Sequence, residues 1–153
     1  MKKLLAIIVL GLLLSGNANA GMLPDESPEK QYKFASNFLK LGDYNNAEYA
    51  FKEFVETNSN HPLAGNAQYW YGETFRIRQR YKDAAEAYLD GYQNYPKSKK
   101  APVNLLKLGM MMIELKEAYQ GCTIIHGLVN QYPQASDALK KKASYEYKKK
   151  IAK

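Results

Sequence analysis

The dipeptide Tyr-Pro closes two similar segments of this chain, at Tyr95-Pro96 and again at Tyr132-Pro133, 37 residues further on. A fixed period of this size is typical of proteins that stack copies of one small unit, because such a unit can bury its apolar face only against a neighbouring copy. The period therefore predicts a repeat architecture, and it sets the spacing at which the rest of the chain can be compared.

Three copies of the unit emerge at this spacing. A small residue recurs at two places in every copy, and apolar side chains of similar size recur beside them. The first copy lacks the closing Tyr-Pro, although Pro62 follows shortly after the equivalent position. The two series of small residues are Ala35, Gly72 and Gly109 and then Ala47, Ala84 and Gly121, and the larger apolar residues include Phe38, Phe75 and Met112 and then Phe51, Tyr88 and Ile125.

Within each copy the apolar side chains are three or four residues apart, as at Tyr81, Ala84, Tyr88 and Tyr92, which is the spacing of a helix with one buried face. A polar stretch divides every copy, and Gly42 in the first of these stretches can take the left-handed conformation that ends a helix. Nothing in the pattern indicates a strand. We therefore expect an all-α fold, an α-solenoid of three helix pairs that cross closely at the small residues, with a capping helix at the C-terminal end.

The first twenty residues are typical of a secretory signal peptide. Lys2 and Lys3 precede an apolar stretch of about eleven residues, and Ala18-Asn19-Ala20 provides a small-residue cleavage site. The alternative, a membrane-spanning anchor, needs about 20 apolar residues. No cysteine follows the cleavage site to carry a lipid. We therefore expect a periplasmic protein of a Gram-negative bacterium, without a stable membrane anchor.

The remaining chain divides into a short linker and one repeat domain. We expect a flexible segment over residues 21–29 and the repeat domain over residues 30–153. The 37-residue period places the three units at about residues 28–64, 65–101 and 102–138, and the capping helix at residues 137–153.

The chain is basic, with a formal net charge of +7, and much of this charge lies in the predicted capping helix. Two interpretations of that helix are open: a patch for an acidic partner or an anionic surface, and a solvated helix whose charges keep the protein in solution. Its lysines are Lys140, Lys141, Lys142, Lys148, Lys149, Lys150 and Lys153, and Glu146 is the acidic residue among them.

The residue inventory argues against catalysis and against a cofactor or metal site. His61 and His126 lie in different units, and neither has a second His, Cys or paired carboxylate at metal-ligand spacing. Cys122, the single cysteine, follows Gly121 and is expected to fill core, although an exposed and reactive thiol is the alternative. Nucleic-acid binding is also disfavoured, because the thirteen tyrosines fall mainly at repeat-core positions and an exported protein does not meet nucleic acid.

The second unit resembles the tetratricopeptide repeat, which has a large residue before a glycine, an aromatic three residues later, a small residue after the turn and a closing proline. Here these positions are Tyr71, Gly72, Phe75, Ala84 and Pro96. The 37-residue period exceeds the usual 34 by three, and the extra residues fall in the linkers between units.

Longer phrases, among them "NAQYWYGE" and "YKDAAEAYLDGYQNYP", resemble the C-terminal repeat domain of the YbgF family of Tol-Pal system proteins, also called the cell division coordinators CpoB. The resemblance covers about residues 30 to 145. It implies a protein that binds TolA and a peptidoglycan synthase, and so links outer-membrane constriction to wall synthesis. Members of the family generally trimerise through a coiled coil before the repeats, for which residues 21–30 leave no room, so the oligomeric state stays open.

A stacked helix-pair solenoid presents the first helices of its units on one concave face, where side chains not needed for packing can contact a partner. Trp70 has a second interpretation, because it could instead pack between adjacent units. The predicted groove residues are Ser36, Lys40, Asn66, Tyr69, Trp70, Glu73, Arg76, Lys107 and Met110.

We therefore expect a non-enzymatic periplasmic adaptor that binds a protein in this groove, as the resemblance to the cell division coordinators implies. The alternative is a periplasmic scaffold for outer-membrane protein assembly. A third interpretation, an enzyme accessory subunit or a reactive-thiol protein, would require Cys122 to be exposed.

Overall fold

The computed structural model describes residues 21–151, and this part of the chain forms seven α-helices. The predicted signal peptide, residues 1–20, lies outside the described residues. The helices are α1 (Pro28–Lys40), α2 (Tyr44–Thr57), α3 (Ala64–Ile77), α4 (Tyr81–Asn94), α5 (Ala101–Glu114), α6 (Ala118–Gln131) and α7 (Asp137–Ile151).

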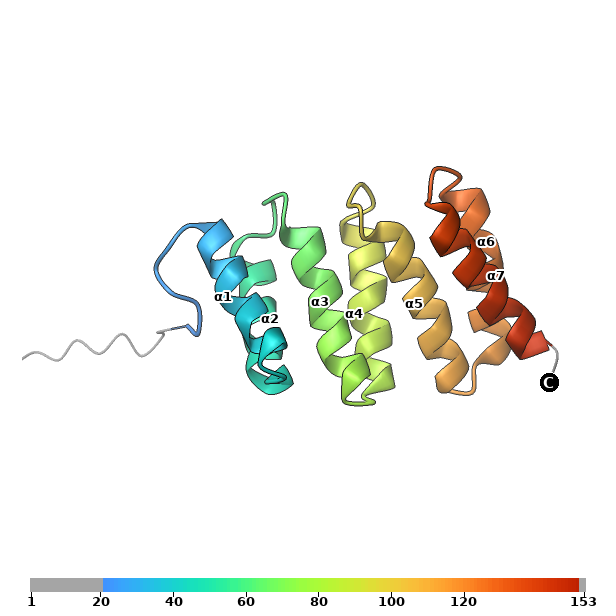
Figure 1. The fold of residues 1–153 in the computed structure, drawn as a ribbon, viewed down its shortest axis with the longest axis horizontal. Helices are drawn as coiled ribbons and strands as arrows, with labels where there is room; N and C mark the ends of the chain where they lie inside the picture. Colours follow the sequence, from blue (N-terminus) through green and yellow to red (C-terminus); the bar gives the residue numbers. More distant parts are fainter. Residues whose placement is uncertain (1–20, 152–153) are drawn as a thin grey trace, which may run out of the picture.

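Each helix packs against the next one along the chain, so the helices form a row of pairs (Figure 1). α1 pairs with α2, α3 with α4 and α5 with α6, and α7 closes the row against α6. Between residues 21 and 151 no residue lies in a strand. The prediction of an all-α solenoid of three helix pairs with a final helix is confirmed.

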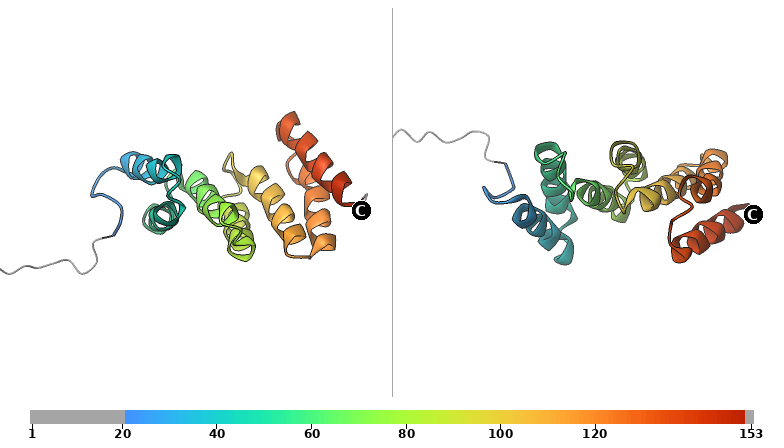
Figure 2. Two further views of the ribbon diagram at one scale, coloured as in Figure 1. Left: turned by 60° about the horizontal axis from the view of Figure 1, so that its bottom comes forward. Right: turned by 90° about the horizontal axis from the view of Figure 1, so that it is seen from above.

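The first helices of the pairs share one face of the row. Seen from above, α2, α4 and α6 lie on one side, α1 and α7 lie on the other, and α3 and α5 lie between them (Figure 2). α7 therefore occupies the place of the first helix of a further pair. We call the surface of α1, α3 and α5 the first-helix face.

The turn within each pair has the same backbone conformation in all three units. Gly42, Gln79 and Lys116 occupy equivalent positions in the 37-residue register, and their φ angles are 72°, 60° and 71°. In the first turn the Gly42 amide donates to the carbonyl of Leu39 and the next amide donates to the carbonyl of Phe38. The other two turns repeat both bonds. This is the Schellman arrangement, which satisfies carbonyl groups at the end of a helix.

The linkers between units also share one hydrogen bond, although their sequences differ. The amides of His61, Ser98 and Ala135 donate to the carbonyls three residues earlier, each over 2.9 Å. These carbonyls belong to positions 58, 95 and 132, where the second and third units carry the tyrosine of Tyr-Pro and the first carries asparagine. The first unit thus ends with the same backbone bond despite its divergent sequence.

The apolar interior is divided into three clusters along the row. One cluster gathers around Phe51 and Phe54, the next around Phe75 and Tyr88, and the third around Leu106, Ile125 and Leu128. The predicted small residues lie where helices of a pair come closest: a Cβ atom on Gly72 would lie 2.7 Å from the ring of Tyr88.

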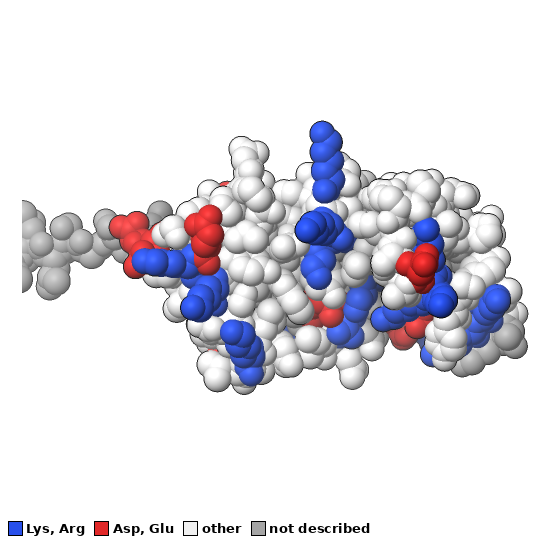
Figure 3. Space-filling view, turned by 45° about the horizontal axis from the view of Figure 1, so that its top comes forward, with Lys and Arg blue, Asp and Glu red and all other residues white. Residues whose placement is uncertain are grey.

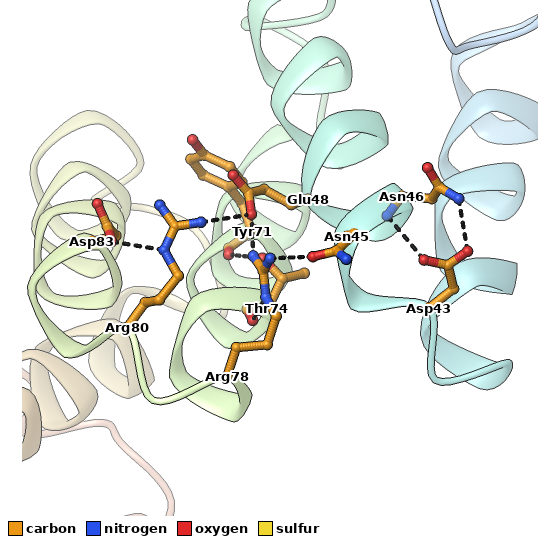
Figure 4. A network of polar contacts seen from close by, with 9 residues as sticks. All are labelled: Asp43, Asn45, Asn46, Glu48, Tyr71, Thr74, Arg78, Arg80 and Asp83. Atoms are coloured by element: carbon orange, nitrogen blue, oxygen red, sulfur yellow. Dashed lines mark hydrogen bonds and ion pairs between the residues drawn. The ribbon is translucent and has the colours of Figure 1, made fainter.

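Charged side chains join the first two units at the turn between α3 and α4 (Figure 4). Glu48 of α2, which is 16% exposed, accepts hydrogen bonds from Arg78 and, over 3.2 Å, from Arg80. Arg80 also pairs with Asp83 of α4 at 2.9 Å. A single carboxylate on α2 is therefore bound by two cations from the next pair.

Residues 21–27, expected to be flexible, lie against α2. The amides of Met22 and Leu23 donate to the carboxylate of Glu53 over 2.6 and 3.2 Å, and both side chains pack against the first apolar cluster.

Candidate functional site

A carboxylate in the middle of the first-helix face is surrounded by donors from three helices. Glu73 of α3 accepts hydrogen bonds from Arg76, one turn further along the same helix, with a shortest distance of 2.7 Å. Lys107 of α5 approaches it to 2.9 Å, and the hydroxyl of Tyr88 from α4 donates to it. Glu73 is 4% exposed, so these contacts lie inside the protein.

The contacts keep Glu73 ionised. Burial alone would raise the pKa of Glu73, but the hydrogen bonds from Arg76, Tyr88 and Lys107 outweigh it and hold the pKa below its ordinary value of 4.5. The pKa of Tyr88 is raised by burial and by the adjacent Glu73 charge, so the phenol stays protonated and can donate. Burial lowers the pKa of Lys107, and the pairing with Glu73 opposes this.

This cluster corrects part of the predicted groove. The expectation that Glu73 is free to contact a partner is wrong, because its oxygens are already bound and buried. Arg76 and Lys107 lie on the same face, and each pairs with that carboxylate, Arg76 through Nε and Nη2. The pair of Glu73 and Lys107 therefore joins α3 to α5. We call Glu73 and its three donors the Glu73 cluster.

An aromatic pair lies beside this cluster. The rings of Tyr69 and Trp70 meet edge to face, with centroids 5.1 Å apart. Tyr69 packs against the second apolar cluster and Trp70 against the first, so the alternative placement of Trp70 between units is the one that the structure shows. Both rings are nevertheless half-exposed. Burial, with the charge of Glu73 as a smaller cause, raises the pKa of Tyr69 to about 12, so its phenol is neutral at any physiological pH.

Lys100, which the sequence did not indicate as a site residue, lies over this pair. Its Nζ atom is 4.3 Å from the ring centroid of Tyr69 and 5.7 Å from that of Trp70. In the part of the chain that the structure describes, no carboxylate lies within ion-pair distance of Lys100. Lys100 lies seven residues, or about two helical turns, before Lys107. This spacing could have indicated that the two lysines lie on the same side of the helix.

The other predicted groove residues are not joined to these groups by hydrogen bonds or ion pairs among residues 21–151. Asn66 and Met110 are half-buried, and Met110 packs between the second and third apolar clusters. The hydroxyl of Ser36 donates to the carbonyl of Tyr32 within α1 over 2.8 Å, and Lys40 is exposed in the last turn of that helix.

Basic side chains are spread along the row on this side, and some of them lie over its middle (Figure 3). A face of this kind can bind another molecule, since it offers the aromatic pair of Tyr69 and Trp70 together with the cation of Lys100, which has no carboxylate within ion-pair distance among the described residues. The described residues contain no group of three or more His, Cys, Asp or Glu side chains that could hold a metal ion.

Cys122 is not the core residue that the sequence predicted. The thiol is half-buried and lines a crevice of about 420 Å³ between α6 and α7, together with Tyr119, His126 and Tyr147. The reason is the helical turn of about 100° per residue: Gly121 occupies the close crossing, so the next side chain points to the side.

Within residues 21–151 no helix has the combination of length and apolar character that a membrane span requires.

Comparison with known protein families gives two matches. Two sequence models described as the tetratricopeptide repeat match the chain, one over residues 32–99 and the other over residues 104–135. The first match spans the first two helix pairs and the second spans the third pair. A comparison with curated proteins gives no match.

Proposed function

Since this chain is a tetratricopeptide repeat domain, and such repeats generally serve as scaffolds for protein–protein interaction, we propose that it is a binding adaptor without catalytic activity. The observation that carries the proposal is the placement of Lys100 over the half-exposed rings of Tyr69 and Trp70. These three side chains form the contact surface, which we call the Tyr69 patch.

The Tyr69 patch has the properties of an interaction hot spot. Tyr and Trp side chains are enriched among the few residues that dominate the binding energy of an interface. The rings are held by the cores of two adjacent units, and this fixed position reduces the entropy lost on binding. The Glu73 cluster next to it fixes the spacing of α3 and α5.

We further propose that the partner is a component of the Tol-Pal system, TolA or a peptidoglycan synthase. The support is the resemblance of phrases such as "NAQYWYGE", which lies in α3 and contains the Tyr69 patch aromatics, to the cell division coordinators. The adaptor would act in the periplasm, where it would keep outer-membrane constriction in step with wall synthesis. The signal-like residues 1–20 support this location.

Direct binding tests the proposal. Purified TolA and purified peptidoglycan synthase are each titrated onto the immobilised protein by biolayer interferometry. At least one of them should bind, and both Lys100→Glu and Tyr69→Ala should weaken that binding by roughly tenfold, the loss expected for a hot-spot side chain. Lys82→Glu makes the same charge change at an exposed position of α4 and should leave binding unchanged.

The outcomes separate the parts of the proposal. Binding that is equal in Lys100→Glu and the parent would place the contact elsewhere. If neither Tol partner binds and an outer-membrane assembly protein does, the scaffold alternative replaces the Tol-Pal interpretation. N-terminal sequencing of the protein from a periplasmic fraction checks its export, and a mature chain that begins at Gly21 is the expected result.

A further inference from the structure

A pocket of about 790 Å³ opens at the linker edge of the row, and the rings of the Tyr69 patch do not line it. The linker between α4 and α5 forms one side, and the linker between α6 and α7 forms the other, with the first turns of α5 and α7 below them. Both linkers lie at the same edge of the molecule (Figure 1). We call this space the linker pocket.

The linker pocket has an apolar floor. Tyr132 and Ala135, which belong to the third core cluster, line it together with Val103 of α5 and Leu139 of α7. Tyr132 and Ala135 are 8% and 9% exposed, so the floor is the surface of the core itself. An apolar side chain that entered the pocket would extend that core, and its apolar surface would be removed from water.

The rim of the linker pocket is basic. Lys97 and Lys99 stand on the first linker, and Lys142 stands on α7. None of the residues that line the pocket in the described part of the chain is Asp or Glu. None of the three lysines takes part in an ion pair within residues 21–151. Three positive charges around an apolar floor thus lack an internal counter-charge.

We propose that the linker pocket binds an acidic segment of a protein partner, with one apolar side chain of that segment inserted between the linkers. The carboxylates flanking the apolar anchor pair with the lysines of the rim. This inference rests on the proposed function in one respect: both require that the partner is a protein.

The shape of the pocket favours a protein segment over other anionic partners. A flat anionic membrane could meet the lysines but could not reach the apolar floor. A single-stranded nucleic acid is bound by stacking its bases on exposed aromatic rings, and the one aromatic side chain of the lining, Tyr132, is nearly buried. A protein segment can do both: a protruding apolar side chain contacts the floor, and its acidic neighbours pair with the lysines of the rim.

The test uses a capped hexapeptide in which Leu-Phe is flanked on each side by two Glu residues. It is titrated into the isotope-labelled protein, and the amide resonances of Val103 and Leu139 are followed by NMR. These resonances should shift with the acidic peptide, and the shifts should weaken at higher salt. Two control peptides, one with Ala-Ala in the centre and one with Lys in place of Glu, should bind at least roughly tenfold more weakly.

Protein variants locate the contact. The triple variant Lys97→Glu, Lys99→Glu and Lys142→Glu should weaken peptide binding by roughly tenfold or more, since three exposed ion pairs are lost. The matched control reverses three exposed lysines elsewhere, Lys33, Lys82 and Lys148, and should bind like the parent. Ala138→Trp, at an exposed position of the lining, fills the pocket without a change of charge and should also abolish the shifts.

Equal binding of the control peptides, or unchanged binding by the triple variant, would overturn the inference. Lysine-dependent binding to phosphatidylglycerol vesicles without binding of the acidic peptide would overturn it in favour of a membrane surface. The Tyr69→Ala variant should bind the peptide like the parent. If no form of the protein binds the peptide, this inference is rejected. The proposed function still stands in that case, provided that the parent binds a Tol partner and Tyr69→Ala does not.

Discussion

Gly109 of α5 and Gly121 of α6 face each other where the two helices of the third pair cross. A Cβ atom on Gly121 would lie 2.5 Å from the carbonyl oxygen of Gly109, and one on Gly109 would lie 2.9 Å from the carbonyl oxygen of Gly121. Isoleucine side chains also lie near both positions, but the carbonyl oxygens belong to the backbone and cannot move aside as the end of a flexible side chain can. The helix pair can come this close only with glycine at both positions.

We predict that Gly121→Ala destabilises the protein by about 1 to 3 kcal/mol, the usual cost of overpacking, and that Gly121→Leu costs more. Urea denaturation followed by circular dichroism measures the free energy of unfolding. Gly127, six residues further along the same helix, provides the control, because a Cβ atom there meets nothing within 4 Å. Gly127→Ala should stabilise α6 by about 0.5 to 1 kcal/mol. The same sign of effect for both alanine variants would contradict the close crossing.

The crossing was predictable because the three copies could be compared within one chain. Small residues at positions 47, 84 and 121 share a place in the repeat, and a shared small residue indicates close approach. The contact between Gly121 and Gly109 was harder to foresee. A repeat register shows which positions are equivalent, whereas the partner across a crossing depends on the angle between the helices.

A left-handed residue ends the first helix of every unit, and two of the three are not glycine. Gln79 and Lys116 have φ angles of 60° and 71°, in a region that costs an L-residue about 1 kcal/mol relative to glycine. We therefore predict that Gln79→Gly and Lys116→Gly each raise the free energy of unfolding by about 0.5 to 1 kcal/mol. Gly42→Ala, at the equivalent turn, should lower it by a similar amount. A decrease in both glycine variants would show that these side chains stabilise the turns by other means.

The polar stretches predicted a turn in all three units, but a left-handed residue only in the first, because Gly42 carries the compositional signal for that region. Gln79 and Lys116 carry no such signal. The 37-residue register alone connects them to Gly42, and the repeated hydrogen bonds confirm that the conformation follows the register.

The Glu73 cluster predicts a specific loss of stability in acid. The pKa of Glu73 in the folded protein lies below its ordinary value of 4.5, so ionised Glu73 contributes its full stabilisation above that pH. The contribution is lost as the pH falls through the folded pKa. Glu73→Gln should lower the free energy of unfolding at pH 7 by about 3 kcal/mol, because Arg76 and Lys107 lose their counter-charge in a buried site.

The difference between the parent and Glu73→Gln is measured by urea denaturation at a series of pH values. It should be constant above the ordinary pKa and should shrink below it, because the parent alone gains a proton on Glu73 there. Tyr88→Phe is the matched variant, since it removes one donor and leaves the charges in place. A difference that does not change with pH would mean that the carboxylate is not held ionised by its partners.

The site shows where sequence reasoning stops. Helical spacing can place Glu73 and Arg76 on one face of α3, since they are three residues apart. It cannot show that Tyr88 and Lys107 reach the same carboxylate from two other helices. The contact of Lys100 with the aromatic pair was not predicted either. Lys100 lies in a basic linker whose composition does not distinguish it from a solvated loop.

The last prediction concerns the junction between the first two units, where Glu48 binds both Arg78 and Arg80 (Figure 4). Glu48→Ala would leave two arginines without this counter-charge, one of them partly shielded from water (Arg78) and the other exposed (Arg80). We expect it to cost about 1 to 2 kcal/mol, between the cost of breaking an exposed pair and that of breaking a buried one, because Arg80 is exposed and keeps Asp83. Glu56→Ala removes a carboxylate from the same helix, where it faces Lys52 in water, and should cost less than about 1 kcal/mol.

In a stacked array each unit is stabilised chiefly by its neighbours, so the loss of stability in Glu48→Ala should be local. Hydrogen exchange should therefore speed up in α1 and α2 and change little in α5 and α6, whereas a uniform increase along the row would show that the array unfolds as one cooperative body.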